Sequence, residues 1–310
     1  MATNRYQGVD PILSDVALAY ENDAYIAELI FPSYKVEKQS AKHFVYDQGR
    51  FKVEENRRGQ GAPSAEVTLT FTTSTSYFAE DHALKQFVSD EDADNATLAA
   101  NPFNDATENV TELHWVAREN ELATMLADTA QLTQNITLSG TSQWSDYTNS
   151  DPVGVVRTGM QTVHAAIHKN PNTLILGKQV YDKLVDHPQF LERVKYSQLG
   201  VMTPELLARI FGVDRVLIGG AAKTTSVEGQ TETTGYIWGK HAILAYIAPV
   251  VRPKILTLGL TYTWKTMQVE RLRGTDEEDR KGTYVRVGNH YYDQKIVSAS
   301  CGYLIKNAVA

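Results

Sequence analysis

Residues 42–78 read KHFVYDQGRFKVEENRRGQGAPSAEVTLTFTTSTSYF, and this stretch decides the fold. Two parts of it, residues 43–46 and 67–72, are rich in β-branched and aromatic residues, which predicts two strands. A hydrophilic segment of roughly 20 residues separates them, and so long a connection is uncommon in a compact domain unless it is functional. A hairpin with so little apolar surface is marginal by itself. We therefore expect it to pack on another surface, and a neighbouring subunit is the first candidate.

The tip of this hairpin carries balanced charge. Residues 47–66 hold four basic and four acidic side chains, a pattern that suits docking on a neighbour through complementary pairs. The predicted inter-subunit contact residues are Arg50, Lys52, Glu54, Glu55, Arg57 and Arg58. The alternative is a solvated loop whose charges make no contact, because exposed ion pairs contribute only about 0 to 1 kcal/mol each.

Composition narrows the class of protein. The chain has 310 residues, 42% of them hydrophobic, which is enough for a substantial core and suggests two domains. Its formal net charge of −7 argues against extensive binding to phosphate backbones. No apolar run reaches the roughly 18 residues of a membrane span, and the N-terminus lacks the pattern of a secretion signal. The single cysteine, Cys301, rules out an internal disulfide and is expected to be a buried strand residue.

Residues 1–40 predict an extended arm with one short helix. Asp10 is placed to cap a helix that begins at Pro11, and Pro32 ends any later helical segment because the residue before a proline is driven to extended geometry. The arm has too few apolar residues to fold alone, so it should lie across its own subunit or across a neighbour. A long helix is then predicted from near Asp105 almost to Ile136, with an apolar stripe at helical spacing.

A different pattern occupies the middle of the chain. Helices at 153–168 and 179–194, with strands at 173–176 and 213–218, predict an α/β domain over about 140–249. The Thr- and Gly-rich residues 223–235 are predicted to form a mobile surface loop. Beyond this domain, residues 256–264 alternate as a half-buried strand should, and 296–305 continue the sheet. Because the long helix precedes the α/β domain and these strands follow it, the middle domain should be inserted into a discontinuous one.

Motifs for chemistry are poorly represented. Asp90, Asp92 and Asp94 have the first spacings of a calcium loop but lack its glycine and its final glutamate. His164 and His168 lie four residues apart on a predicted helix without the glutamate of a metalloprotease. We therefore predict no catalytic, cofactor or metal site, and a protein that is not an enzyme.

The order of arm, extended hairpin, long helix, inserted α/β domain and returning strands resembles the major capsid protein of tailed bacteriophages, the Hong Kong 97-type fold, over nearly the whole chain. Local motifs agree: IFPSYKV at 30–36, NTLILG at 172–177 and GYIWGK at 235–240. The resemblance implies an α+β chain made of an N-terminal arm (1–40), an extended β-hairpin loop (41–80), a peripheral domain with a spine helix in two parts (81–138 and 250–310), and an inserted α/β axial domain (139–249).

The same resemblance implies self-assembly into pentamers and hexamers of an icosahedral virion shell, built in the host cytoplasm, that encloses double-stranded DNA without sequence-specific binding. No cofactor or membrane is implied. A separate scaffolding protein and a portal are expected partners, with room for a decoration protein. The alternatives are an encapsulin-like nanocompartment shell that encloses a protein cargo and, in a third class, a monomeric binding or catalytic protein. Neighbouring genes would separate the two shells, since a portal and a terminase accompany a phage head.

Overall fold

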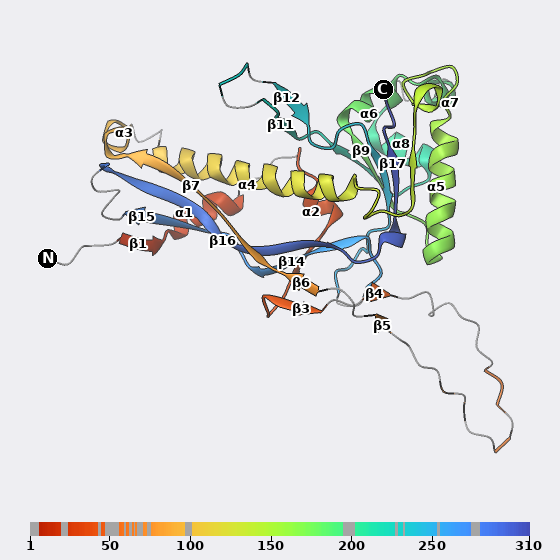
Figure 1. Ribbon diagram of the computed structural model, residues 1–310, viewed down its shortest axis with the longest axis horizontal. Helices are drawn as coiled ribbons and strands as arrows, with labels where there is room; N and C mark the ends of the chain where they lie inside the picture. The colour runs from red at the N-terminus through yellow and green to blue at the C-terminus, as the bar shows by residue number, and fades with distance from the viewer. Residues whose placement is uncertain are drawn as a thin grey trace.

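The computed structural model describes residues 6–19, 24–42, 45–46, 56–58, 60–61, 64, 66, 71–72, 76–96, 101–194, 202–226, 229–231, 233–252, 255–273 and 280–310. Helices and sheets are mixed over these residues, as predicted for an α+β chain. One sheet has six strands and another has five. The long helix α4 (Pro102–Leu126) lies along the first sheet and reaches toward the second (Figure 1).

The six-stranded sheet is assembled from both ends of the chain. Its order is β1 (Tyr6–Val9), β15 (Gln268–Arg273), β16 (Gly282–Ile296), β14 (Gly259–Lys265) and β2 (Ser33–Lys35), and β7 (Glu80–Ser89) also pairs with β16. All pairs are antiparallel except β14 with β2. Helices α1 (Pro11–Ala19) and α4 pack on this sheet, and their buried side chains Leu13, Ala106 and Val110 form one apolar cluster with Val269 of β15 and Val287 of β16.

The five-stranded sheet organises the second part of the body. Its order is β10 (Arg215–Gly219), β9 (Thr173–Gly177), β13 (Ala242–Ala245), β17 (Gly302–Lys306) and β8 (Asn135–Thr137). Four helices accompany it: α5 (Pro152–Ile167), α6 (Lys178–Val185), α7 (Pro188–Val194) and α8 (Pro204–Phe211). Every residue of β9 is buried, which explains why this strand is a continuous apolar run and does not alternate.

The predicted pairing of the two hairpin strands is confirmed at residues 45–46 and 71–72. Strands β4 (Val45–Tyr46) and β5 (Phe71–Thr72) pair antiparallel, and β3 (Ser40–Lys42) pairs with β6 (Ser76–Phe78) closer to the body. The hairpin leads away from both sheets (Figure 1). Residues 43–44 and 67–70 of the predicted strands lie outside the described residues.

The arm lies across its own subunit, one of the two predicted alternatives. Strand β1 pairs with β15, α1 contacts α4, and β2 pairs with β14. A short helix, α2 (Ala27–Ile30), ends directly before Phe31-Pro32, as predicted. The predicted domain limits stay predictions, although β17 and β8, at the edges of the predicted peripheral segments, both belong to the five-stranded sheet.

Several element boundaries differ from the predictions. Helix α4 begins at Pro102, capped by the side chain of Asn101, and it ends at Leu126 and not near Ile136. The apolar spacing continues past the helix because Leu132 is buried from the turn that follows, and residues 135–137 then form β8. Residues 296–305 are not one strand: β16 ends at Ile296, a 3-10 turn covers Ala299–Cys301, and β17 joins the other sheet. Cys301 is buried, but in that turn.

Two smaller regions complete the fold. The acidic segment after β7, which has the first spacings of a calcium loop, forms a short helix, α3 (Asp90–Asn95). The predicted mobile loop at 223–235 is bounded by a hairpin of β11 (Ala222–Thr224) and β12 (Thr234–Tyr236).

Within the described part of the chain, no helix is long and apolar enough to span a bilayer, and no three His, Cys, Asp or Glu residues converge as metal ligands.

Candidate subunit interface

The base of the extended hairpin is anchored in an aromatic cluster. The ring of Tyr77, on β6, stacks on Tyr262, on β14, with centroids 4.5 Å apart and planes 8° from parallel. Tyr34 meets Tyr262 edge-on at 6.2 Å, and the indole of Trp264 donates to the carbonyl of Glu37 at 3.1 Å. Burial raises the pKa of the Tyr262 hydroxyl. Stacked and edge-on aromatic pairs stabilise by about 0.5 to 1.5 kcal/mol beyond their buried area, so the hairpin leaves the body from a fixed support.

Polar contacts fix the direction of the hairpin at the same place. Asp293 accepts a hydrogen bond from the backbone N–H of Phe78 at 2.9 Å, and Gln39 donates to the carbonyl of Ala79 at 3.0 Å. The Phe78 side chain is nevertheless 54% exposed. A large aromatic ring held by its backbone and turned to solvent is a suitable anchor for a protein partner.

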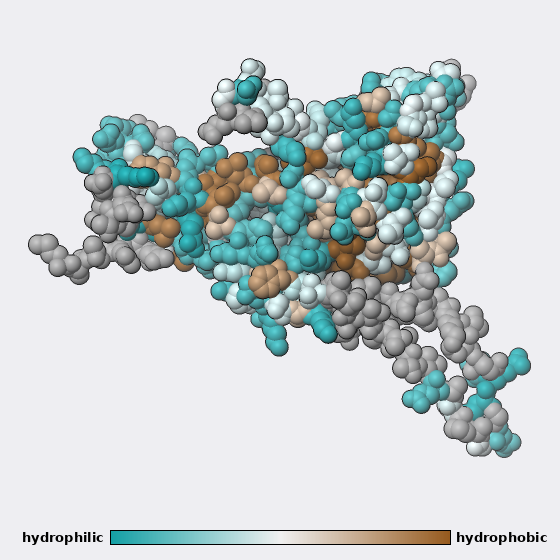
Figure 2. Space-filling model, viewed as in Figure 1, coloured by the Kyte–Doolittle hydropathy of each residue, from teal (hydrophilic) through white to brown (hydrophobic). Residues whose placement is uncertain are grey.

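The described part of the hairpin tip is exposed and hydrophilic. Arg57 and Arg58 are both solvent-exposed, as is Glu66. Most of the described part of the projecting hairpin is coloured as hydrophilic in the space-filling view (Figure 2). Four of the predicted contact residues, Arg50, Lys52, Glu54 and Glu55, lie outside the described residues. The tip as an inter-subunit contact therefore stays a prediction.

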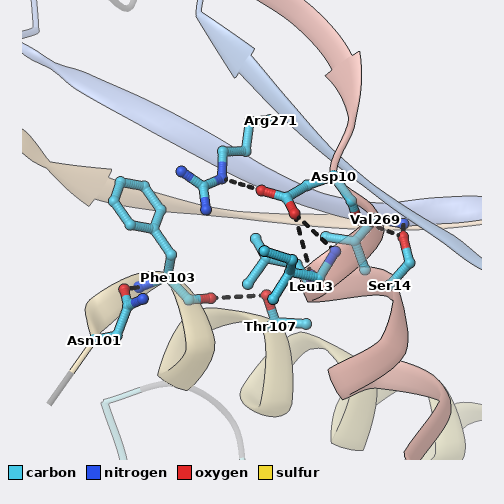
Figure 3. A network of polar contacts seen from close by, with 9 residues as sticks. Asp10, Leu13, Ser14, Asn101, Phe103, Thr107, Val269 and Arg271 are labelled. Carbon is cyan, nitrogen blue, oxygen red and sulfur yellow. Dashed lines mark hydrogen bonds and ion pairs between the residues drawn. The ribbon is translucent and has the colours of Figure 1, made fainter. Parts of the chain in front are cut away.

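Asp10 connects the arm to the six-stranded sheet (Figure 3). Its Oδ1 accepts the N–H groups of Ile12 and Leu13 at 3.0 and 3.2 Å, which confirms the predicted helix cap. Its Oδ2 lies 2.8 Å from Nε of Arg271, and that guanidinium lies over the ring of Phe103 on α4 at 4.5 Å. The Asp10 carboxylate thus caps α1 and pairs with Arg271 of β15, and Arg271 in turn contacts the long helix.

Ser14 makes a second connection in the same network. Its hydroxyl donates to the carbonyl of Asp10 at 2.7 Å and accepts the N–H of Val269 at 3.1 Å. On the helix side, Asn101 caps α4 by accepting the N–H of Phe103 at 3.1 Å, and Thr107 donates to the carbonyl of Phe103 at 2.7 Å (Figure 3). Ser14 therefore holds the first turn of α1 against β15, while the contacts of Asn101 and Thr107 fix the first turn of α4 itself.

Replacing Asp10 by alanine should lower the free energy of unfolding by about 1 to 2 kcal/mol, because a helix cap and a partly buried ion pair are lost together. Chemical denaturation of the purified subunit measures this change. Asp15→Ala on the exposed face of the same helix is the matched control and should change stability by less than about 0.5 kcal/mol. Equal effects of the two substitutions would contradict the assignment of Asp10 as the arm's anchor.

Glu119 joins three parts of the chain inside the body. It is fully buried on α4 and accepts the N–H groups of Ile26 and Ala27 at the start of α2, at 3.1 and 2.8 Å. It also accepts the indole N–H of Trp238. Burial raises the pKa of Glu119, and these three hydrogen bonds oppose that shift.

The position of Trp238 is itself tightly determined. Its indole occupies the space in which a Cβ on Gly219 would sit, with the nearest ring atom 2.1 Å from that position. Trp238 follows the β11–β12 hairpin and belongs to the core of the second sheet region.

Glu119 was not among the predicted residues. The sequence did hold a signal for it, because a glutamate occurs within the apolar stripe of Trp115, Leu122 and Leu126 at helical spacing.

Three histidines, His114 on the long helix, His82 on β7 and His290 on β16, lie between this helix and the six-stranded sheet but form no metal site with the described residues. His290, on β16, packs against Tyr292 at 4.7 Å and Trp115 at 6.4 Å, and burial, with Arg118 nearby, lowers its pKa to about 3. His114 contacts the carbonyl of Val287 through Nε2 at 3.0 Å. His82 stacks on Tyr292 at 4.0 Å. Their ring contacts indicate a packing role. His164 and His168 are exposed on α5 and at its end.

A body of two sheets connected by a long helix, with an arm and an outward hairpin fixed at its base, defines the class of shell-building structural proteins. Residues 129–246 match the family model described as phage major capsid protein E. The chain is 30% identical over 311 residues to the major capsid protein of Burkholderia phage BcepMu, covering 96% of this chain and 95% of that one. This chain therefore belongs to the phage major capsid protein family, and its role is that of a structural component of the virion.

Solved structures agree at the level of the fold. A phage-related protein from Bordetella bronchiseptica RB50 superposes with a TM-score of 0.78 at 23% identity, covering 97% of this chain and 98% of that chain. The capsid structure of Cyanophage P-SCSP1u gives a TM-score of 0.57 at 10% identity, covering 89% of this chain and 85% of that chain. The predicted family and function are confirmed, and the nanocompartment alternative has no better support.

Proposed function

We propose that this chain adopts the Hong Kong 97-type capsid fold and self-assembles into pentamers and hexamers of the icosahedral head of a tailed phage. In this proposal α4 is the spine helix, the six-stranded sheet is the core of the peripheral domain, and the region of α5 to α8 is the axial domain. The observation that carries the proposal is the extended hairpin. Its base is fixed by the Tyr77–Tyr262 stack, while its tip leads away from the subunit (Figure 1), so that its natural partner is another copy of the chain.

The proposal includes the partners that the resemblance to tailed-phage capsid proteins implies. A separate scaffolding protein sets the size of the shell, a portal occupies one vertex, and a decoration protein has room on the outer surface. Assembly takes place in the host cytoplasm. The shell encloses double-stranded DNA without sequence-specific binding, because the formal net charge of −7 leaves a container wall that repels the phosphate backbone more than it holds it.

Sedimentation and electron microscopy of the purified chain test this proposal. Capsomers or closed particles are expected to sediment much faster than the 34.5 kDa monomer, either alone or with a co-expressed scaffolding protein. Duplex DNA added at physiological salt should associate weakly and without sequence preference. A monomer that stays a monomer at every concentration and with scaffold, or nanomolar binding to a particular DNA sequence, would refute the shell.

A further inference from the structure

His187 lies at the start of α7 and is only 1% exposed. Its Nδ1 accepts the N–H of Gln189 at 3.2 Å, while its backbone carbonyl accepts the N–H groups of Phe190 and Leu191 at 3.0 and 3.2 Å. A side-chain acceptor that binds a free N–H in the first turn is the usual role of Ser, Thr, Asp or Asn. Here an imidazole performs that role, and an imidazole is the only such group that titrates near neutral pH.

The hydrogen bonds determine which ring nitrogen carries the proton. The hydroxyl of Ser150 donates to the carbonyl of Asp146 at 2.6 Å, so it accepts from Nε2 of His187, 3.0 Å away. With Nδ1 accepting and Nε2 donating, the ring is neutral. Because Ser150 accepts this hydrogen bond and does not donate it, His187 does not activate Ser150 as a nucleophile; a histidine that activates a serine must accept its proton.

The surroundings favour the neutral ring. Burial lowers the pKa of His187, and the carboxylate of Asp151, the N-cap residue of α5, opposes that shift. Asp151 is already engaged, since it accepts the N–H of Gly154 and the side-chain amide of Gln189, each at 3.0 Å, and Arg157 and Arg193 lie in its field. The carboxylate of Asp146 faces Thr148 and Asn149. The ring contacts of His187 itself are with Tyr147 and Phe190.

We propose that His187 is an acid-sensitive cap: a proton on Nδ1 breaks the bond to Gln189 and releases α7 from the rest of the second sheet region. The added N–H would point at another N–H, and the imidazolium would stand at the positive end of a helix. The element released carries Leu191, which is 51% exposed. These contacts lie within one chain, so the proposal holds independently of the proposed shell geometry.

The pH range follows from the direction of the shift. An uncapped, solvated imidazole has a pKa near 6.5, whereas His187 in the closed structure has a lower pKa. Between these two values the open state binds more protons than the closed state. The stability of the cap is therefore complete above about pH 6.5 and is lost as the pH falls below it.

Hydrogen exchange of the backbone N–H groups in α7, followed by mass spectrometry from pH 7.5 to pH 5 and corrected for the chemical exchange rate, tests the proposal. In the natural chain the opening equilibrium constant should rise below pH 6.5 by up to about tenfold per pH unit, the slope for one proton. His187→Asn keeps an acceptor suited to a cap but cannot titrate, so its profile should be flat. His164→Asn, at an exposed position on α5, should keep the natural profile.

Two outcomes would overturn the proposal. One is protection of α7 that does not change between pH 7.5 and pH 5 in the natural chain. The other is a His187→Asn variant that opens with the same slope as the natural chain. If that variant does not fold, an NMR titration of His187 in the natural chain decides instead, since a pKa at or above 6.5 would show that the closed structure does not exclude the proton.

Discussion

Replacing Glu119 by alanine should lower the free energy of unfolding by about 3 to 5 kcal/mol and leave little folded subunit at 37 °C. The substitution removes the acceptor for the N–H groups of Ile26 and Ala27 and for the indole of Trp238. All three donors belong to buried residues, and each buried group left without a partner costs about 1 to 3 kcal/mol. The loss is large because the arm, the long helix and the second sheet region depend on one side chain.

Guanidinium denaturation of the purified subunit measures the effect. Glu108→Ala, at an exposed position of the same helix, is the matched control and should change stability by less than about 0.5 kcal/mol. Glu119→Gln should fall between the two, because its amide keeps one acceptor oxygen but turns N–H donors toward other donors. An alanine variant within 1 kcal/mol of the natural chain would show that Glu119 does not connect the three elements.

The fold was predictable where local sequence determines structure. Asp10 caps α1, and the apolar run of β9 is a buried strand. The errors occur where the deciding contact is distant in sequence. Nothing near Gly302 indicates that β17 leaves the sheet of β16 and pairs with β13 and β8. Strand β15 was not predicted, since Val269 and Leu272 are its only apolar residues and their spacing of three does not follow the period of a strand; its pairing with β1 and β16 is long-range.

The candidate interface likewise has features that the local sequence predicts and features that depend on distant contacts. Charge balance and polarity along the hairpin identify its tip, because these properties belong to consecutive residues. The support for the hairpin is different: Tyr77 stacks on Tyr262 across a sequence separation that no local pattern reports. Two further residues gain a structural role only in the tertiary fold. Glu119, on the apolar stripe of α4, accepts hydrogen bonds from the arm, and His187 caps α7.

Reversing both charges of Arg57 and Arg58 to glutamate should strongly reduce the yield of assembled particles while the subunit stays folded. Both side chains are exposed, so no core contact changes and the thermal melting temperature of the subunit should be preserved. Exposed ion pairs contribute about 0 to 1 kcal/mol each. Two reversals would cost each subunit contact about 1 to 2 kcal/mol, a factor of roughly 5 to 30 in its association constant, and a closed shell repeats that contact many times.

Particle yield by sedimentation, read beside circular dichroism and thermal melting of the subunit, tests this expectation. Arg57→Lys with Arg58→Lys is the matched control, because it keeps both positive charges and should assemble nearly as well as the natural chain. Loss of assembly with both pairs of substitutions would point to the guanidinium geometry and not to charge. Normal yield and normal particle stability after the double reversal would instead establish the solvated-loop alternative, in which the hairpin contacts its neighbour through other residues. The exposed ring of Phe78, at the base of the hairpin, would then be the next side chain to replace.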